Sequence, residues 1–142
     1  MPAAVVSNLT STTHNWAFQG EPEPGLDGRV IQHDRGKTIG GSSSINGMVF
    51  IRGHALDYDG WQQAGCPGWG YADVLPYFKR METYGGGGDE FRGIGGPLHV
   101  HRAEPQDPIT LAFIKAGQEA GYPITNDVSG YCQEGFGVSD RT

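Results

Sequence analysis

The residues best suited to chemistry form a run of glycines and serines near position 40. Gly40 and Gly41 precede Ser42, Ser43 and Ser44, and the run leads into an Ile-Asn-Gly-Met sequence. Because glycine has no Cβ, a ligand can approach the main chain closely there. Free backbone amides at the start of a helical turn favour anions. The run therefore predicts a phosphate-binding turn, although its composition fits a flexible surface linker equally well.

A nucleotide-hydrolysing P-loop is the first alternative for this region, because Gly36-Lys37-Thr38 looks like the end of that motif. The pattern G-x-x-x-x-G-K-S/T requires a glycine where this chain has Ile31. The glycines that follow also do not fit a strand-to-helix layout. We therefore exclude nucleotide hydrolysis.

Two histidines offer a second alternative, a metal site. His99 and His101 are one residue apart on an expected strand, so both rings would face the same side. No third ligand is apparent, and none of the five histidines has a serine or cysteine nucleophile beside it. Surface or packing roles are the favoured interpretation, and we expect no metal and no hydrolytic catalysis.

The three tryptophans could act in binding or in packing. Trp16, Trp61 and Trp69 could wall a site for a cationic alcohol, since an aromatic face attracts a cation. Packing in a core is the favoured interpretation for each of them.

Composition and charge narrow the possible partners. The chain has 142 residues, a formal net charge of -6, 24 glycines and 9 prolines, and only 37% apolar residues. Without a Lys/Arg cluster it lacks the footprint of a nucleic-acid binder. No apolar stretch approaches the roughly 20 residues of a membrane span. Cys66 and Cys132 are far apart and indicate two reduced thiols, hence a cytoplasmic protein.

The elements that must position these residues are short and joined by loops. The clearest is a helix over residues 108–120, with Asp107 as N-cap, Pro108 in the first position and Gly121 beyond the end. Glycines over residues 85–96 predict a mobile loop. Other expected elements are an extended segment and reversal over residues 12–28, strands over 29–33 and 97–102, and helices over 55–64 and 71–82.

The glycine-serine run also carries a family resemblance. Residues 36–46, followed by Phe50, Gly53 and Asp59, resemble the first signature of the glucose-methanol-choline oxidoreductases. The flanking segments on both sides resemble the choline dehydrogenase branch of that family. The similarity covers essentially the whole chain.

This resemblance implies an α/β fold: part of an FAD-binding domain plus the start of a substrate domain, loop-rich, with a few helices and short strands. The FAD-contacting loop would occupy residues 35–59, and a helical and loop segment residues 60–142. The implied activity is that of an FAD-dependent dehydrogenase oxidising a small primary alcohol, choline-like, to an aldehyde by hydride transfer to the flavin.

The resemblance also implies which residues contact the cofactor. Some members of the family attach FAD through a histidine at the position of Ile45, which cannot form that bond. We therefore expect non-covalent FAD. The implied FAD contacts are Gly40, Gly41, Ser42, Ile45, Asn46, Gly47 and Val49.

Two family features are missing from the chain. Neither the G-x-G-x-x-G start that binds the ADP part of FAD nor the catalytic histidine of the C-terminal part is present. We expect an internal fragment that is inactive without the remainder of the parent polypeptide, and membrane association of the full enzyme stays open. The alternative is a non-catalytic module or a split flavoprotein subunit.

Overall fold

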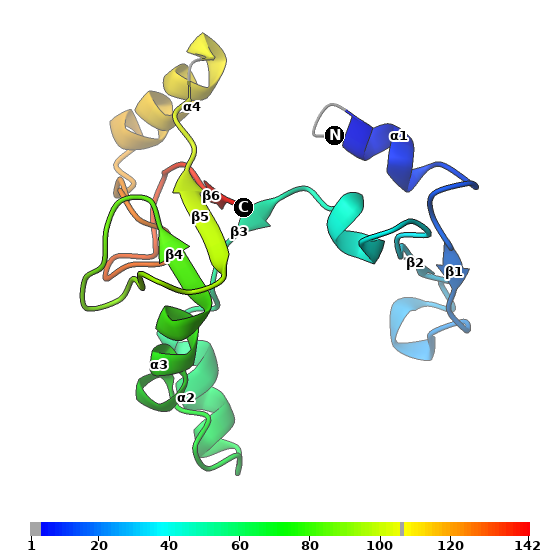
Figure 1. The fold of residues 1–142 in the computed structure, drawn as a ribbon, viewed down its shortest axis with the longest axis horizontal. Coiled ribbons are helices and arrows are strands. Elements are labelled where there is room, and N and C mark those ends of the chain that lie inside the picture. The colour runs from blue at the N-terminus through cyan, green and yellow to red at the C-terminus, as the bar shows by residue number, and fades with distance from the viewer. Residues whose placement is uncertain (1–3, 106) are drawn as a thin grey trace. The chain divides into compact units, whose positions relative to one another are not determined.

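The computed structural model describes residues 4–105 and 107–142 and divides the chain into two compact units. The first unit is Met1–Met48 and the second is Val49–Thr142. Figure 1 shows the elements of both units. The mixture of helices with small sheets confirms the expected α/β class, and we describe each unit by itself.

The first unit is built around a small hairpin. Strands β1 (Phe18–Gln19) and β2 (Gln32–His33) pair antiparallel, with Phe18 opposite His33. The chain reverses between them through a 3-10 turn, η2 (Pro24–Leu26), so the predicted extended segment, reversal and strand are confirmed, the strand over two residues only. A short helix, α1 (Val5–Leu9), was not predicted.

One buried amide holds the first unit together. Asn15 is 3% exposed, and its Nδ2 donates to the Leu9 carbonyl and to Asp34 Oδ1, each at 2.7 Å. Its Oδ1 accepts from the backbone amides of Ala17 and Arg35, each at 3.0 Å. The hydrogen bond from Asn15 lowers the pKa of Asp34. Asn15 therefore ties the end of α1 to the segment that enters the glycine-serine run.

A close backbone approach shapes the glycine-serine run. A Cβ at Gly36 would overlap the Gly41 carbonyl group, so only glycine fits there. The Gly36 amide donates to Ser42 Oγ at 3.1 Å. The chain thus closes on itself between residues 36 and 42.

In its described residues, 49–105 and 107–142, the second unit contains three helices and a four-stranded sheet. The strand order is β3-β6-β5-β4, in which only the β4–β5 pair is parallel. The strands are β3 (Val49–Phe50), β4 (Glu82–Tyr84), β5 (Leu98–Arg102) and β6 (Asp140–Arg141), and the helices are α2 (Ala55–Gln63), α3 (Tyr71–Met81) and α4 (Pro108–Glu119). The predicted helices over 55–64, 71–82 and 108–120 and the strand over 97–102 are confirmed to within one residue at each end.

Local signals in the sequence explain these helices. His54 and Asp57 form a capping box at the start of α2. Asp107 Oδ1 accepts from the Ile109 amide at 2.8 Å, and Gly121, with φ of 88°, follows the end of α4. Helix α3 runs through Pro76 without ending there. Capping chemistry thus sets where α2 and α4 begin.

Aromatic rings join α2 to α3. The ring of Tyr58 lies 5.3 Å from that of Trp61 and 5.5 Å from that of Phe78, centroid to centroid, in edge-to-face geometry. Trp61 and Trp69 lie 5.9 Å apart in the same way. These two tryptophans therefore pack against other rings, but each is about half exposed and lies outside the core in which packing was expected.

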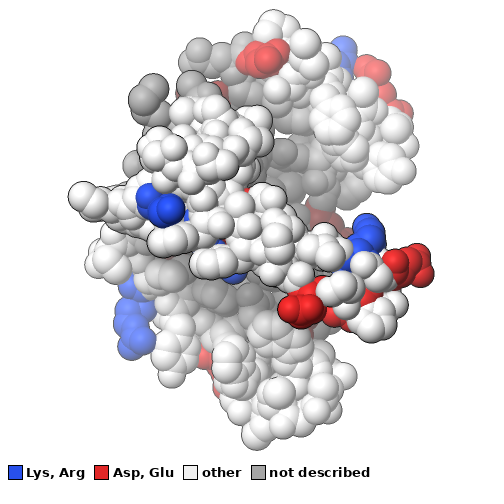
Figure 2. Space-filling view, turned by 90° about the vertical axis from the view of Figure 1, so that its right-hand side faces the viewer, with Lys and Arg blue, Asp and Glu red and all other residues white. Residues whose placement is uncertain are grey.

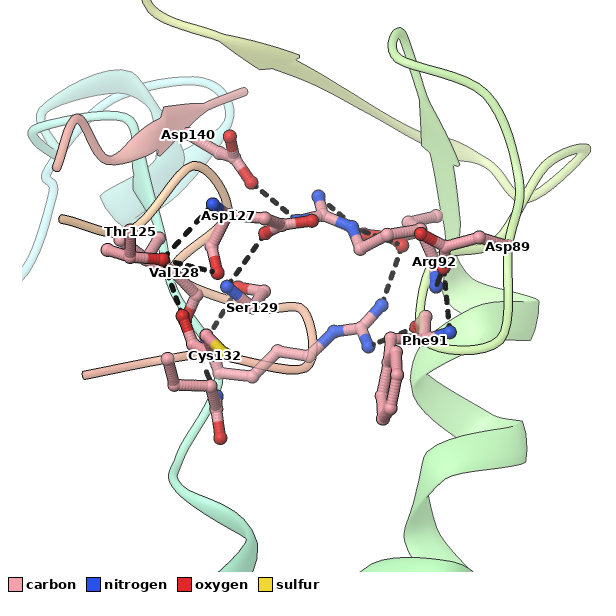
Figure 3. Close-up of polar contacts among 12 residues, drawn as sticks. Asp89, Phe91, Arg92, Thr125, Asp127, Val128, Ser129, Cys132 and Asp140 are labelled. Carbon is pink, nitrogen blue, oxygen red and sulfur yellow. Dashed lines mark hydrogen bonds and ion pairs between the residues drawn. The ribbon is translucent and has the colours of Figure 1, made fainter. Parts of the chain in front are cut away.

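Charged side chains, rather than apolar ones, fill the centre of the second unit. Arg92 and Glu82 are 1% and 0% exposed, and Asp140 is 1% exposed. Arg92 Nη1 lies 2.7 Å from both Asp127 Oδ1 and Asp140 Oδ2, and its Nε lies 3.1 Å from Glu82 Oε1. Arg52 Nη2 donates to the same Glu82 oxygen at 2.6 Å. Figure 3 shows Arg92 between carboxylates that come from separate parts of the unit.

This buried ion cluster (Arg52, Glu82, Arg92, Asp127 and Asp140) has three carboxylates and two guanidinium groups. Burial raises the pKa of Asp140, while the hydrogen bond from Arg92 acts in the opposite direction. The guanidinium of Arg92 also lies 3.7 Å from the centre of the Tyr84 ring.

The buried ion cluster anchors part of the glycine-rich loop over residues 85–96. Arg92 and Gly93 are buried, and the Gly93 amide donates to Glu82 Oε1 at 2.8 Å. Lys79 Nζ donates to the Asp89 carbonyl at 2.6 Å. The loop forms as predicted, but its second half is packed against β4 and the end of α3 instead of being free.

Arg92→Met is expected to lower the free energy of unfolding by about 3–5 kcal/mol, because buried carboxylates lose their partner. Urea unfolding measures the change. As a matched control, Lys115→Met breaks the exposed Lys115–Glu119 pair at 3.6 Å and should cost less than about 1 kcal/mol. Equal losses in the two variants would contradict this role of Arg92.

Gly36→Ala is expected to lower the free energy of unfolding by roughly 2–4 kcal/mol, because the new Cβ meets backbone that cannot swing away. Gly25→Ala is the control in the same unit, since its Cβ would make only an ordinary contact, 3.6 Å from Glu23 Oε1. That control should stay within about 0.5 kcal/mol of the wild type. Thermal or urea unfolding of both variants measures these changes, and equal losses would contradict the close backbone approach at Gly36.

Candidate functional site

Two left-handed glycines shape the predicted binding loop. Gly40 has φ of 89° and Gly41 φ of 58°, and they precede and begin a single 3-10 turn, η3 (Gly41–Ser44). Glycine adopts this conformation at little cost. A Cβ at Gly41 would meet no other atom within 4 Å. The side of the main chain that would carry a Cβ is therefore open at Gly41, whereas at Gly40 a Cβ would meet Ser44 Oγ at 2.6 Å.

The serine hydroxyls act inside the loop. Ser43 Oγ donates to the Gly40 carbonyl at 2.7 Å, and Ser44 Oγ donates to the Ile39 carbonyl at 2.8 Å. Ser42 Oγ accepts from the Gly36 amide, as described above. Ser42 was the one serine expected to contact the cofactor, and all three hydroxyls make hydrogen bonds within the loop.

Two isoleucines flank the turn with opposite exposure. Ile45 is 4% exposed and belongs to the small apolar core, whereas Ile39 is fully exposed, at 100%. Ile45 was expected to contact the cofactor. Its side chain is buried, so only its backbone is left for such a contact.

The loop ends in a second left-handed turn. Asn46 Oδ1 accepts from the Met48 amide at 2.9 Å, and Met48 has φ of 58°. A Cβ at Gly47 would meet nothing within 4 Å. Val49, the first residue of β3, is 60% exposed. Of the seven expected contacts, the structure brings the six within residues 40–47 into one loop of the first unit, and Val49 follows as the first residue of the second.

The loop is suited to binding rather than to proton transfer. Residues 38–51 contain no Asp, Glu, His, Lys, Cys or Tyr. The Gly41 amide already donates to the Thr38 carbonyl at 3.0 Å. Within the described chain, the loop donors without a hydrogen bond include the backbone amides of Gly40 and Gly47 and the exposed Asn46 side-chain amide. The structure thus agrees with a binding site that holds no acid or base of its own.

A cation lies close to the loop within the first unit. Lys37 Nζ lies 4.5 Å from the centre of the Trp16 ring, and Trp16 is 52% exposed. Trp16 also stacks on Phe18 at 6.0 Å with 9° between the ring planes. Of the three tryptophans, Trp16 thus has an exposed face that already attracts a positive charge.

The other candidate residues stay separate. His99 and His101 are exposed on β5, and within residues 4–105 and 107–142 no three His, Cys, Asp or Glu side chains gather as metal ligands would. In the same part of the chain, no helix has the length and apolar character needed to cross a bilayer. On the face shown in Figure 2, the Lys and Arg side chains stand apart instead of forming a stripe.

Sequence reasoning missed two residues that shape the loop. Gly36 was read only as part of a motif, and its close approach to Gly41 depends on a fold that the sequence does not display. Met48 was not singled out, although an asparagine two residues before it is a signal for a side-chain-capped turn.

The comparisons with known proteins agree with this geometry. A family model described as GMC oxidoreductase matches residues 4–142. The oxygen-dependent choline dehydrogenase of Sinorhizobium fredii is 54% identical over 142 residues, which is 100% of this chain and 26% of that protein. This chain thus spans about a quarter of the length of the curated relatives that it matches.

Solved structures of known oxidoreductases also superpose on this chain. Pyridoxine 4-oxidase from Mesorbium loti superposes with a TM-score of 0.76 at 35% identity, over 90% of this chain and 25% of that one. An FAD-dependent oxidoreductase from Chaetomium thermophilum superposes with a TM-score of 0.67 at 30% identity, over 82% of this chain and 22% of that one. Signature, fold and family model agree, and the chain belongs to the GMC oxidoreductase family.

Proposed function

We propose that this chain is the flavin-contacting part of an FAD-dependent dehydrogenase that oxidises a choline-like primary alcohol to an aldehyde. The observation that carries the proposal is the pair of left-handed glycines that leaves the main chain bare at Gly41, with Gly47 equally open beyond it. The choline dehydrogenase name of the relatives supports the substrate class, and the name of the Chaetomium protein supports FAD.

The loop fits a flavin nucleotide in shape and in chemistry. Gly41 and Gly47 present backbone to open space, where a planar or phosphorylated group can approach without meeting a side chain. The Asn46 side chain is exposed and can donate a hydrogen bond. Within this family the proposed contacts are Gly40, Gly41, Ser42, Ile45, Asn46, Gly47 and Val49, with Ile45 acting through its backbone.

The chain's own part in the reaction is to bind and to orient. FAD, when bound, supplies the acceptor for the hydride of the alcohol. Residues 38–51 hold no titratable side chain, so they can neither take nor return the alcohol proton. The seven proposed contacts would hold and orient the cofactor, and the acid-base group is proposed to lie outside residues 38–51.

We further propose that FAD is held without a covalent bond. The side chain of Ile45 is a hydrocarbon and is 4% exposed, so it offers neither a nucleophile nor access.

Cys66 and Cys132 are both exposed and unpaired, which is typical of proteins in a reducing compartment. We therefore propose a cytoplasmic location.

Gly47→Leu is expected to fold but to lose bound FAD. No atom lies within 4 Å of a Cβ at Gly47, and the residue is not left-handed, so the chain itself tolerates the side chain. A leucine there would occupy the space proposed for the cofactor. The measurement is the flavin content of the protein purified from the complete open reading frame, by absorbance and fluorescence.

The matched control is Gly60→Leu, in α2, where an added Cβ also meets nothing within 4 Å. It should keep its flavin, and leucine should favour the helix more than glycine does. If Gly47→Leu retains as much FAD as Gly60→Leu, residues 40–49 do not lie against the cofactor. A wild-type protein without flavin would favour the non-catalytic alternative.

Acid precipitation of the holoprotein is expected to release all of the flavin into the supernatant, because the chain has no bond to it at Ile45. Ile45→His, which places a histidine at this position, is the comparison variant for a covalent bond to FAD. Yellow colour that stays in the wild-type pellet would contradict non-covalent binding.

A further inference from the structure

Left-handed residues other than glycine are rare in the described chain, and they reveal a pattern. Such residues are Ala17 at φ of 45°, Asp27 at 55° and Met48 at 58°. Aspartate tolerates this region, whereas alanine and methionine do so poorly. Both Ala17 and Met48 therefore need support from their surroundings.

The support has the same form in both places. The Ala17 amide donates to Asn15 Oδ1 at 3.0 Å, and the Met48 amide donates to Asn46 Oδ1 at 2.9 Å. In each case the asparagine lies two residues before the left-handed residue. A side-chain oxygen in this position closes a turn that imitates a backbone turn.

The two asparagines differ in what their amide nitrogens do. Asn15 is buried, and its Nδ2 is used within the unit by Leu9 and Asp34. Asn46 is exposed, and its Nδ2 makes no hydrogen bond to any residue in the described part of the chain. The Asn15 side chain thus serves only the fold of the first unit, whereas the Nδ2 donor of Asn46 has no partner in the described part of the chain.

We propose that Asn46 is a positioning residue: its Oδ1 holds Met48 left-handed and so sets the path of the main chain through Gly47, while its Nδ2 remains available to the flavin. This inference rests on the proposed function for the flavin contact, but not for the turn. The turn is a property of the chain alone and exists without the cofactor.

The substitutions at Asn46 separate its two atoms. Asn46→Asp keeps an oxygen to accept from the Met48 amide and removes the Nδ2 donor, whereas Asn46→Ala removes both. Asn46→Ala is expected to weaken FAD binding about 5- to 30-fold, the effect of one or two lost hydrogen bonds. Asn46→Asp should also weaken FAD binding, yet leave the thermal midpoint of the apoprotein at the wild-type value, while Asn46→Ala lowers it.

The decisive test is rescue at position 48. Met48→Gly adopts a positive φ without support, so adding it to Asn46→Ala should restore the apoprotein midpoint and recover part of the lost FAD affinity. Met48→Ala is the matched control, because it removes the same side chain but keeps the Cβ that disfavours the turn. It should rescue neither quantity.

The protein expressed from the complete open reading frame is used throughout, with added FAD as the ligand. If Met48→Gly and Met48→Ala, each combined with Asn46→Ala, behave alike in both measurements, the positioning role is wrong. If the wild type binds no FAD, the proposed function fails, while the ranking of apoprotein midpoints still decides the role of Asn46 in the turn.

Discussion

The guanidinium of Arg92 is the contact on which the second unit depends. It lies between Glu82 of β4 and Asp140 of β6 and also reaches Asp127, so one side chain joins the two strands that flank β5 to a distant loop. Arg52 adds a second cation on Glu82. Apolar burial is small by comparison, since the buried apolar residues in the described part of this unit are Phe50 and Val100. Removing Arg92 would leave the buried Asp140 without an ion-pair partner in the described chain, which is costly.

The proposed binding loop of the first unit is held in a different way. Its shape comes from close backbone approach at Gly36, from three serine hydroxyls that bond to nearby main chain, and from the turn closed by Asn46. These are short-range contacts, which leave the outer surface of Gly41 and Gly47 bare. A loop built in this way can present its backbone to a ligand while keeping a defined shape.

Local chemistry explains which elements the sequence could predict. The Asp107 cap, the apolar repeat and Gly121 together identified α4, and the alternation around Val100 identified β5. The binding loop was found through its extended signature, which also predicted the family. The left-handed Gly40 and Gly41 and the open space at Gly47 fit the site that was expected there.

Contacts between distant residues explain what the sequence did not show. Arg92 and Asp140 are 48 positions apart, and Arg52 and Glu82 are 30 apart. Charged residues are ordinarily exposed, so nothing local marked these as a core. The same holds for Ile45, expected at the ligand but buried. It also holds for residues 89–93, whose neighbouring glycines suggested freedom but which are anchored by Glu82 and Lys79.

The most direct test of the account is hydrogen–deuterium exchange of the complete protein with and without FAD. The backbone amides of residues 40–47 should exchange more slowly when FAD is bound, because the cofactor covers main chain that the protein leaves open. The amides of residues 85–88, in the exposed half of the glycine-rich loop, should not change. Unchanged exchange at residues 40–47 with FAD bound would show that the cofactor lies elsewhere.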